Sequence, residues 1–377
     1  MNWKILGSDD PEWNDSLAGL PHDFYQTPAY YRFESENGEG IAHAFVARSG
    51  EKRFLWPYLL KQVVVPGVTE HVAMTEVRSA YGYSGPVCSL DCDTSFLTLA
   101  FQSLVEVWRS QGVVNAFCRL HPVLSTHDVC ARVIETGALD AWKPANTGFL
   151  VHHGKTVSID LRLDTDTRRA RYSAALRKGV RRNQRDGVRT VRDADFRHLR
   201  DFYEFYIATM DRNQASKYYY FSFDYFERLA RHLPGIVHLF VTGAGKRPSC
   251  AALISEYEQK LQALFIMANP NSEVKAPSRT LIDDVCDWGR ERQATDFHLG
   301  GGVGGAKDSL FDFKAQFSGV HRDFYTCRLV LDSDKYARLV RIRGAVSQLD
   351  EAETFFPAWR KPLPLAAELE VCETVQS

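Results

Sequence analysis

The sequence lacks any long apolar run. A membrane-spanning helix needs about 20 apolar residues, and a secretory leader needs an apolar core near the N-terminus. The first ten residues contain no such core, and the apolar stretch Val63–Val65 is followed at once by Pro66 and Gly67. We therefore expect a cytoplasmic protein with no membrane-spanning segment.

The sequence also lacks an excess of charge of one sign. It has 46 Lys and Arg against 47 Asp and Glu, which gives a net charge of −1 over 377 residues. No overall field selects a nucleic acid or a membrane surface as partner. Any electrostatic recognition must come from a local cluster of charges.

Metal-binding and phosphate-binding signatures are missing as well. The eight cysteines form no CxxC pair, and the GxxxxGK[ST] phosphate loop does not occur. Cys88 and Cys92 with His121 and His127 have poor spacing for a zinc site. We predict reduced, mostly buried cysteines, no metal and no bound cofactor.

The chain contains two successions of helices and strands in a similar order, which indicates two related domains. Expected helices cover 27–34, 94–111, 170–186, 195–210, 224–232, 278–293, 309–317 and 335–350. Expected strands cover 42–47, 54–60, 113–120, 156–161, 235–241, 249–256, 261–267, 295–299 and 324–331. The pattern predicts an α+β fold with mixed, mostly antiparallel sheets flanked by helices, in domains 1–148 and 149–332, followed by a helix and tail over 333–377 that could pack on the first domain.

The segment from Phe297 to Phe317 is the most informative. A strand runs into five glycines within six residues, then Asp308 and Ser309 start a helix that carries Phe313 and Lys314. Glycine allows positive φ and close approach of a ligand to the backbone. The alternative is a flexible surface loop with a solvated lysine. We interpret the loop, including Gly300, Gly301 and Gly302, as facing a ligand.

This segment resembles the end of the Fem-like transferases, a branch of the GNAT superfamily that includes peptidoglycan aminoacyltransferases and BioF2-like proteins of bacteria. Three other segments match the family in the same order, so that the resemblance covers most of residues 20–331. They are Tyr81–Pro86, which has Ser84 where the family has glycine, the basic stretch Leu176–Val188, and Met210–Phe221.

The resemblance implies tandem GNAT-like domains and a reaction centre at Phe313 and Lys314, where the lysine stabilises the tetrahedral intermediate or holds the acceptor. It also implies that basic and aromatic residues hold the acceptor. The candidates are Arg212, Tyr218, Tyr219 and Tyr220, with Arg32 and Trp56 from the first half. The first-domain ligands do not align residue by residue, so specificity for a peptidoglycan precursor is not carried over.

A strongly basic stretch spans residues 168–200, with twelve Arg and Lys against three Asp. Such a patch suits the phosphates of tRNA, a nucleotide sugar or coenzyme A, and a solvated helix face is the alternative. Within it we predict that the donor phosphates are bound by Arg177, Lys178, Arg181 and Arg182.

The acyl donor is aminoacyl-tRNA or acyl-CoA. GNAT enzymes hold the coenzyme A pyrophosphate on a glycine-rich turn at a helix N-terminus. Residues 269–278 occupy that place, but they contain no glycine, and they include Glu273 and Pro277. This favours aminoacyl-tRNA. The general base is open: His298, Glu256 and Tyr257 are weak candidates.

The leading hypothesis is therefore an acyltransferase that forms an amide bond by moving an aminoacyl group from aminoacyl-tRNA to an amine of a sugar, peptide or amino acid. One alternative is an acyl-CoA-dependent N-acyltransferase of cell-envelope polysaccharide or natural-product biosynthesis. Another is a non-catalytic binding protein built on a GNAT fold. The sequence does not define the acceptor or the oligomeric state.

Overall fold

The computed structural model describes residues 1–68, 73–145, 148–245, 247–346 and 355–361. By its internal contacts the chain divides into two compact units, residues 1–152 with 325–377 and residues 153–324. The chain passes from the first unit to the second within β7 (Leu150–Asp160) and returns within β13 (Val320–Val330). In the described ranges, no helix is long and apolar enough to cross a membrane.

Unit 1 is built on a mixed sheet with strand order β1-β2-β3-β4-β6-β13, in which β4 and β6 are parallel and β5 pairs with β3. Its strands are β1 (Asn2–Gly7), β2 (Ile41–Ser49), β3 (Lys52–Gln62), β4 (Thr75–Arg78), β5 (Val87–Cys88) and β6 (Val113–Arg119). Its helices before β7 are α1 (Glu12–Leu17), η1 (Phe24–Gln26), α2 (Pro28–Glu36), α3 (Thr94–Ser110), α4 (Thr126–Ile134) and η2 (Asp140–Trp142).

The core of unit 1 lies between α3 and the sheet. Asp93 caps α3 by accepting a hydrogen bond from the Phe96 amide, and the helix then buries apolar residues at helical spacing. A second, smaller cluster joins α11 (Ser333–Val346) and η5 (Ala358–Arg360) to the sheet through Leu339, Trp359 and Val114. The expected helix 335–350 corresponds to α11, and residues 347–350 lie outside the described part.

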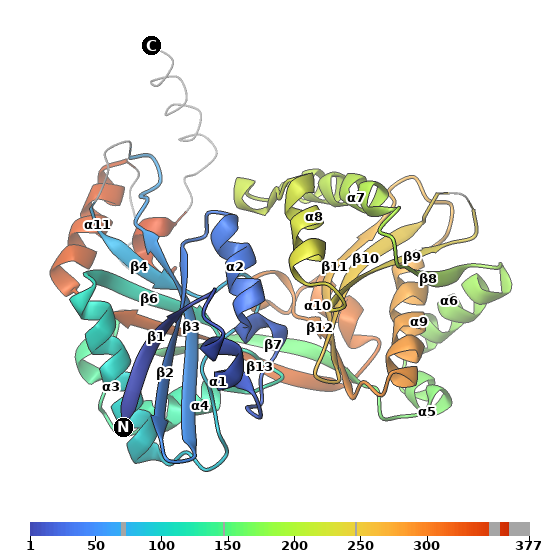
Figure 1. Ribbon diagram of the computed structural model, residues 1–377. Coiled ribbons are helices and arrows are strands. Elements are labelled where there is room, and N and C mark those ends of the chain that lie inside the picture. Colours follow the sequence, from blue (N-terminus) through green and yellow to red (C-terminus); the bar gives the residue numbers. More distant parts are fainter. Residues whose placement is uncertain (69–72, 146–147, 246, 347–354, 362–377) are drawn as a thin grey trace. The chain divides into compact units, whose positions relative to one another are not determined.

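The part of the sheet that belongs to unit 2, which we call the second sheet, is also mixed and has the strand order β7-β12-β11-β10-β9-β8 (Figure 1). Its further strands are β8 (Arg189–Asp193), β9 (Val237–Gly243), β10 (Cys250–Tyr257), β11 (Lys260–Ala268) and β12 (Asp296–Gly300). Its helices are α5 (Thr165–Ala170), α6 (Ala174–Arg185), α7 (Leu199–Arg212), η3 (Lys217–Tyr219), α8 (Phe223–His232), α9 (Pro277–Glu291), η4 (Val303–Gly305) and α10 (Ser309–Ala315).

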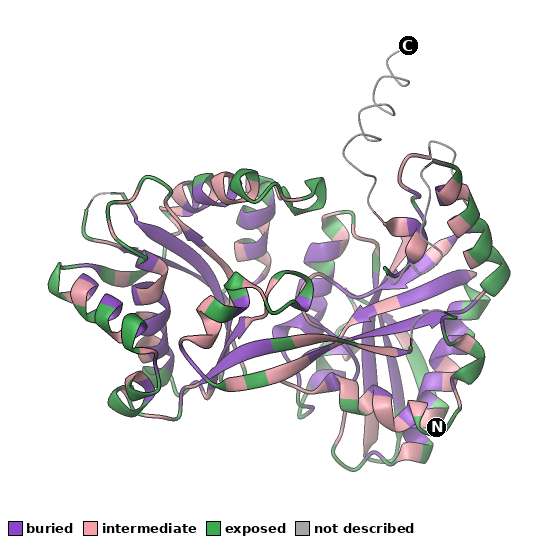
Figure 2. Ribbon diagram, turned by 180° about the vertical axis from the view of Figure 1, so that it is seen from behind, coloured by how far each residue is buried: buried purple, intermediate pink, exposed green. Residues whose placement is uncertain are grey.

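Helices cover both faces of this second sheet. On one face, α6, α9 and α10 share an apolar core with side chains such as Ile159, Leu261 and Phe297. On the other face, α7 and α8 pack aromatic rings around Phe265 of β11. Successive side chains of a strand therefore point to opposite faces of the sheet, one face covered by α6, α9 and α10 and the other by α7 and α8. Figure 2 shows the buried strands between exposed helix surfaces.

Several expected elements have different bounds in the structure. The single basic helix expected over 170–186 is two helices, because Ser173 adopts an extended conformation and caps α6 by accepting a hydrogen bond from Leu176. The helix expected from 195 begins at Leu199, since Phe196 has a positive φ of 53°. β8 is not among the expected strands, because its residues are mostly charged and show no alternation of apolar and polar residues in the sequence.

Candidate functional site

The glycine-rich segment after β12 packs against its own fold at backbone distance. A Cβ added to Gly302 would lie 2.1 Å from the carbonyl oxygen of Ala306, and one added to Gly154 of β7 would lie 2.1 Å from that of Gly305. Gly305 also has a φ of +89°, which disfavours other residues. Close packing of the loop on the start of β7 therefore requires glycine at these positions, independently of any ligand.

Asp308 closes this loop. One carboxylate oxygen accepts a hydrogen bond from the Phe311 amide (2.9 Å) and so caps α10, while the other accepts from the Val303 amide (2.8 Å). These two hydrogen bonds to backbone amides lower the pKa of the Asp308 carboxyl. The cap was visible in the sequence, whereas the tie to Val303 was not, because it depends on how the loop folds back.

Lys314 lies on α10 and turns back to the loop. Its Nζ donates to the carbonyl oxygen of Gly301 at 2.6 Å. Burial lowers the pKa of Lys314 to about 8, and the nearby Asp308 opposes this shift. With a pKa near 8 the group is still about nine-tenths protonated at pH 7. An ammonium has three N–H donors, so the bond to Gly301 leaves two for a substrate.

The neighbours of Lys314 hold α10 firmly. Phe313 packs edge-on against Phe317, with the ring centroids 5.7 Å apart. Phe317 belongs to the apolar core that includes residues of α9, and Phe313 packs against this core. At the end of α10, Gln316 accepts hydrogen bonds from the Arg279 side chain (3.2 Å) and from the Ser173 amide (3.1 Å). The structure thus brings together Lys314, Phe313 and Gly300–Gly302.

A row of buried polar residues crosses the sheet on the α7 side, close to where β12 ends. Ser158, His298, Gln262 and Ser255 lie opposite one another on four neighbouring strands. His298 Nδ1 is 3.3 Å from Gln262 Oε1. The parallel pairing of β11 with β12 covers only Lys260–Gln262, although β11 continues to Ala268. His298 therefore lies where the two strands part.

The other two weak candidates for the general base lie at the end of β10. Glu256 is held by Arg292 (2.7 Å) and by His238 Nε2 (3.2 Å), and Arg292 also stacks on Trp288 of α9. Tyr257 is half-buried beside it. Glu256 is thus committed to ion pairs on the α9 side of the sheet, the side opposite to His298.

The predicted acceptor ligands of unit 2 lie on the connection between α7 and α8. Arg212 is exposed in the last turn of α7, and Tyr218 and Tyr219 are about two-fifths exposed on η3. Tyr220 donates to Asp211, which fixes the turn. These side chains form an exposed aromatic surface, but they are on the face of the sheet opposite to α10.

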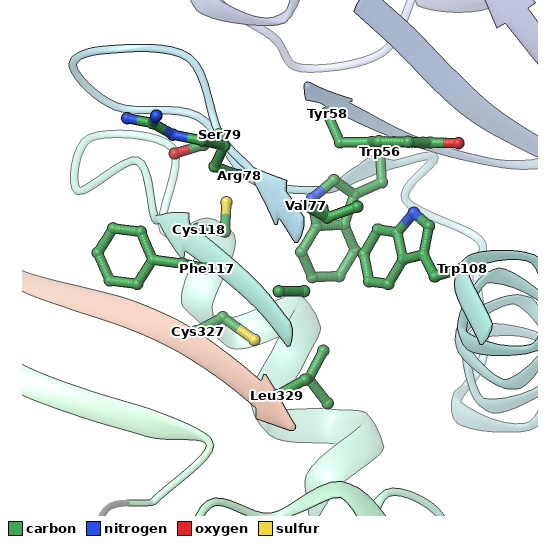
Figure 3. Close-up of a pocket in the computed structure, with 11 residues that line it drawn as sticks. Trp56, Tyr58, Val77, Arg78, Ser79, Trp108, Phe117, Cys118, Cys327 and Leu329 are labelled. Carbon is green, nitrogen blue, oxygen red and sulfur yellow. The ribbon is translucent and has the colours of Figure 1, made fainter. Parts of the chain in front are cut away.

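The two candidates of unit 1 have structural partners. Trp56 is 2% exposed and packs against Phe101 in the core. It also packs against Trp108 beside a cavity of about 10 Å³ (Figure 3), too small for more than a single water molecule. Arg32 donates to the Ser8 carbonyl and pairs with Asp9. In this structure the Trp56 ring is therefore covered, and Arg32 ties the turn after β1.

The four predicted donor ligands of α6 have different surroundings. Arg177 donates to the carbonyl oxygens of Ala170 (3.0 Å) and Tyr172 (2.5 Å). Arg182 is directed to the Lys275 carbonyl (3.4 Å), and Lys178 and Arg181 are exposed. Two of the four therefore stabilise the fold directly, and all four still contribute positive charge to this surface.

In the segment 269–278 before α9, four of the eight backbone amides donate hydrogen bonds, three of them to acceptors within the segment. The amides of Asn269, Asn271, Ser272 and Val274 donate to Ser249 O, Asn269 Oδ1, Asn269 O and Ser272 Oγ, respectively. Pro270 and Pro277 have no N–H, and α9 has no side-chain cap. These bonds and the two prolines reduce the number of amides that can surround a pyrophosphate.

Comparison with known proteins identifies the class. Residues 167–314 match the model of the acetyltransferase (GNAT) domain, and this segment contains α6, strands β8 to β12 and Lys314. This part of unit 2 is therefore similar to a GNAT domain, as the resemblance to the GNAT superfamily predicted.

The whole chain shares its fold with FemX, at 14% identity and a TM-score of 0.66, over 90% of this chain and 99% of that one. It also resembles L-PGS from Bacillus licheniformis, at 15% identity and a TM-score of 0.51, over 86% and 92% of the two chains. The C-terminal domain of a putative lysylphosphatidylglycerol synthetase from Agrobacterium fabrum is 14% identical, with a TM-score of 0.50, over 89% of this chain and 96% of that one. No curated protein matches the sequence. The α+β class with mixed sheets flanked by helices is confirmed.

Proposed function

We propose that the protein forms an amide bond by transferring an aminoacyl group from aminoacyl-tRNA to the amine of a sugar, peptide or amino acid. The observation that carries this proposal is the position of Lys314. Its ammonium is partly buried, is fixed by the Gly301 carbonyl and keeps two donors for a substrate.

The chemistry follows from that geometry. When an amine attacks an ester or thioester carbonyl, negative charge develops on the carbonyl oxygen. A cation held in a partly desolvated place stabilises this oxyanion far better than one in water. The loop and Asp308 hold α10 in position beforehand, so that little reorganisation accompanies the reaction. Phe313 packs against Phe317 and so helps to hold α10 on the apolar core.

The turn before α9 supports aminoacyl-tRNA as the donor. Phosphate binding at a helix N-terminus depends on free amides, and here four amides already donate hydrogen bonds, three of them within the turn, and two positions are proline. The GNAT model match favours the second candidate, an acyl-CoA-dependent N-acyltransferase.

A mass-spectrometric screen of amine acceptors, run with charged tRNA and separately with acyl-CoA, tests the proposal. We expect product with charged tRNA and a loss of at least 100-fold in kcat for Lys314→Met, since one oxyanion donor is worth about that much. Lys307→Met, an exposed lysine of the same segment, is the matched control. Product from acyl-CoA alone would select the second candidate. Unchanged turnover in Lys314→Met would reject the role of Lys314, and no product with either donor would point to a binding protein.

A further inference from the structure

A pocket of about 570 Å³ lies between α5 and α6 of unit 2. Helix α6 lines it with Arg177, Val180, Arg181 and Gln184, whose spacing of three, four and seven residues places them on one face of the helix. Asp166 and Arg169 of α5 line the other side. A pocket of this volume is in the range of sites for small molecules and nucleotides.

Arg177 is oriented before any ligand arrives. Its Nη1 donates to the carbonyl oxygens of Ala170 and Tyr172, at the break between the two helices. These bonds involve one nitrogen of the guanidinium and fix its plane, whereas Arg181, one turn further along α6, is exposed. Two guanidinium groups one turn apart suit the oxygens of a phosphate, which they can bind by paired hydrogen bonds.

The remaining charges of the pocket leave these two arginines in excess. Arg169 pairs with Asp283 (2.6 Å) and Asp287 (3.1 Å), and the buried Arg168 pairs with the same two carboxylates, so these four charges cancel. Arg177 and Arg181 then face only Asp166 in the wall, two positive charges against one negative. The pocket therefore favours an anion.

The pocket also adjoins the helix that carries Lys314. The ring of Tyr172, which lines the pocket, packs edge-on against Phe317 (5.4 Å), and the Ser173 amide donates to Gln316. Gln316 and Phe317 directly follow α10. A ligand in the pocket is thus separated from the end of α10 by a single layer of side chains.

We propose that this pocket binds phosphate groups of the nucleotide portion of the acyl donor. This inference rests on the proposed function, and it explains how a donor is held although half of the amides in the turn before α9 already donate hydrogen bonds. The phosphates come either from the 3′-terminal nucleotides of tRNA or from coenzyme A. Arg177 and Arg181 contact the phosphates, and Gln184 borders the nucleotide.

Equilibrium binding to the full-length protein tests this assignment with two probes, a labelled RNA hairpin that copies a tRNA acceptor stem with its 3′ end, and coenzyme A. We expect Arg181→Met to lower the affinity for one of the probes by roughly tenfold or more, because a charge-assisted hydrogen bond is lost. Arg177→Met should act in the same direction. Arg185→Met removes an exposed charge of α6 outside the pocket wall and should stay within about twofold. Circular dichroism and thermal unfolding confirm that each variant folds.

The probe whose binding is weakened identifies the source of the phosphate. Inorganic pyrophosphate should compete with that probe and displace it from the wild type. Wild-type affinity in Arg181→Met for both probes would overturn the proposal. So would an equal loss in Arg185→Met, which would indicate a diffuse basic surface, or an absence of binding by the wild type. If binding depends on Arg181 but the wild type forms no acyl product with any donor, the pocket stands and the proposed function fails.

Discussion

Replacing Lys314 by methionine should make the protein more stable at neutral pH. Burial lowers the pKa of Lys314 from 10.5 to about 8, so the folded protein resists the charged form relative to the unfolded chain. The difference between the two values corresponds to roughly 3 kcal/mol. This is a large share of the 5–15 kcal/mol that stabilises a typical domain.

The sign of the pH dependence follows from proton linkage. Below pH 8 the lysine is protonated in both states, so the folded protein bears the full cost of about 3 kcal/mol. Between pH 8 and 10.5 the folded state loses the proton while the unfolded chain keeps it, and the cost disappears. The stability advantage of Lys314→Met should therefore be greatest near pH 7 and should shrink steadily as the pH rises.

Urea unfolding of the wild type and Lys314→Met at several pH values from 7 to 10 measures this difference. Methionine has nearly the same volume as lysine and creates no large cavity. Lys307→Met serves as control, and since Lys307 is exposed, its effect should remain within about 0.5 kcal/mol throughout. A variant less stable than the wild type at pH 7, or a difference that does not change with pH, would refute the reasoning.

Three further variants probe the loop and the two cores. Gly302→Ala should lower activity and cost about 1–3 kcal/mol, because the new methyl would lie 2.1 Å from a carbonyl oxygen, whereas Gly319→Ala, with open space around it, should be neutral in unfolding and activity assays. Trp56→Ala should lower the free energy of unfolding by about 3–5 kcal/mol while the KM for the acceptor stays the same. A raised KM would indicate that Trp56 contacts the substrate. Arg168→Met should cost about 3–5 kcal/mol in urea unfolding, because it leaves the buried carboxylate of Asp283 without one of its partners, and an unchanged midpoint would contradict this.

Patterns with a strong local cause could be predicted from the sequence. The apolar spacing along α9, the strand that ends in five glycines and the cap at Asp308 all depend on neighbours in the chain, and each is present in the structure. The order of elements was enough to predict the α+β class. Lys314 could be singled out only because a resemblance to a known family accompanied the pattern.

The remaining features depend on contacts between distant segments. Nothing local shows that Gly154 of β7 must make room for Gly305, or that His298 and Gln262 meet at the point where two strands part. Aromatic residues are ambiguous for the same reason, because a tryptophan is suited both to binding a ligand and to filling a core. Trp56 lies in the core. The sequence also shows a continuous basic stretch, whereas Ser173 divides it and so creates the pocket lined by Arg177 and Arg181.

The energetics of Lys314 support the functional role that we propose for it. A lysine kept for stability would form an ion pair or reach into solvent, and its pKa would stay near the ordinary value or rise. Lys314 instead donates to a carbonyl oxygen in a partly buried position, where its charge costs roughly 3 kcal/mol. The fold holds it there with a glycine loop and the cap of Asp308, two features that serve to position α10. A destabilising cation held this rigidly is what stabilisation of a transient negative charge requires, because an ammonium already desolvated needs no reorganisation when the oxyanion forms.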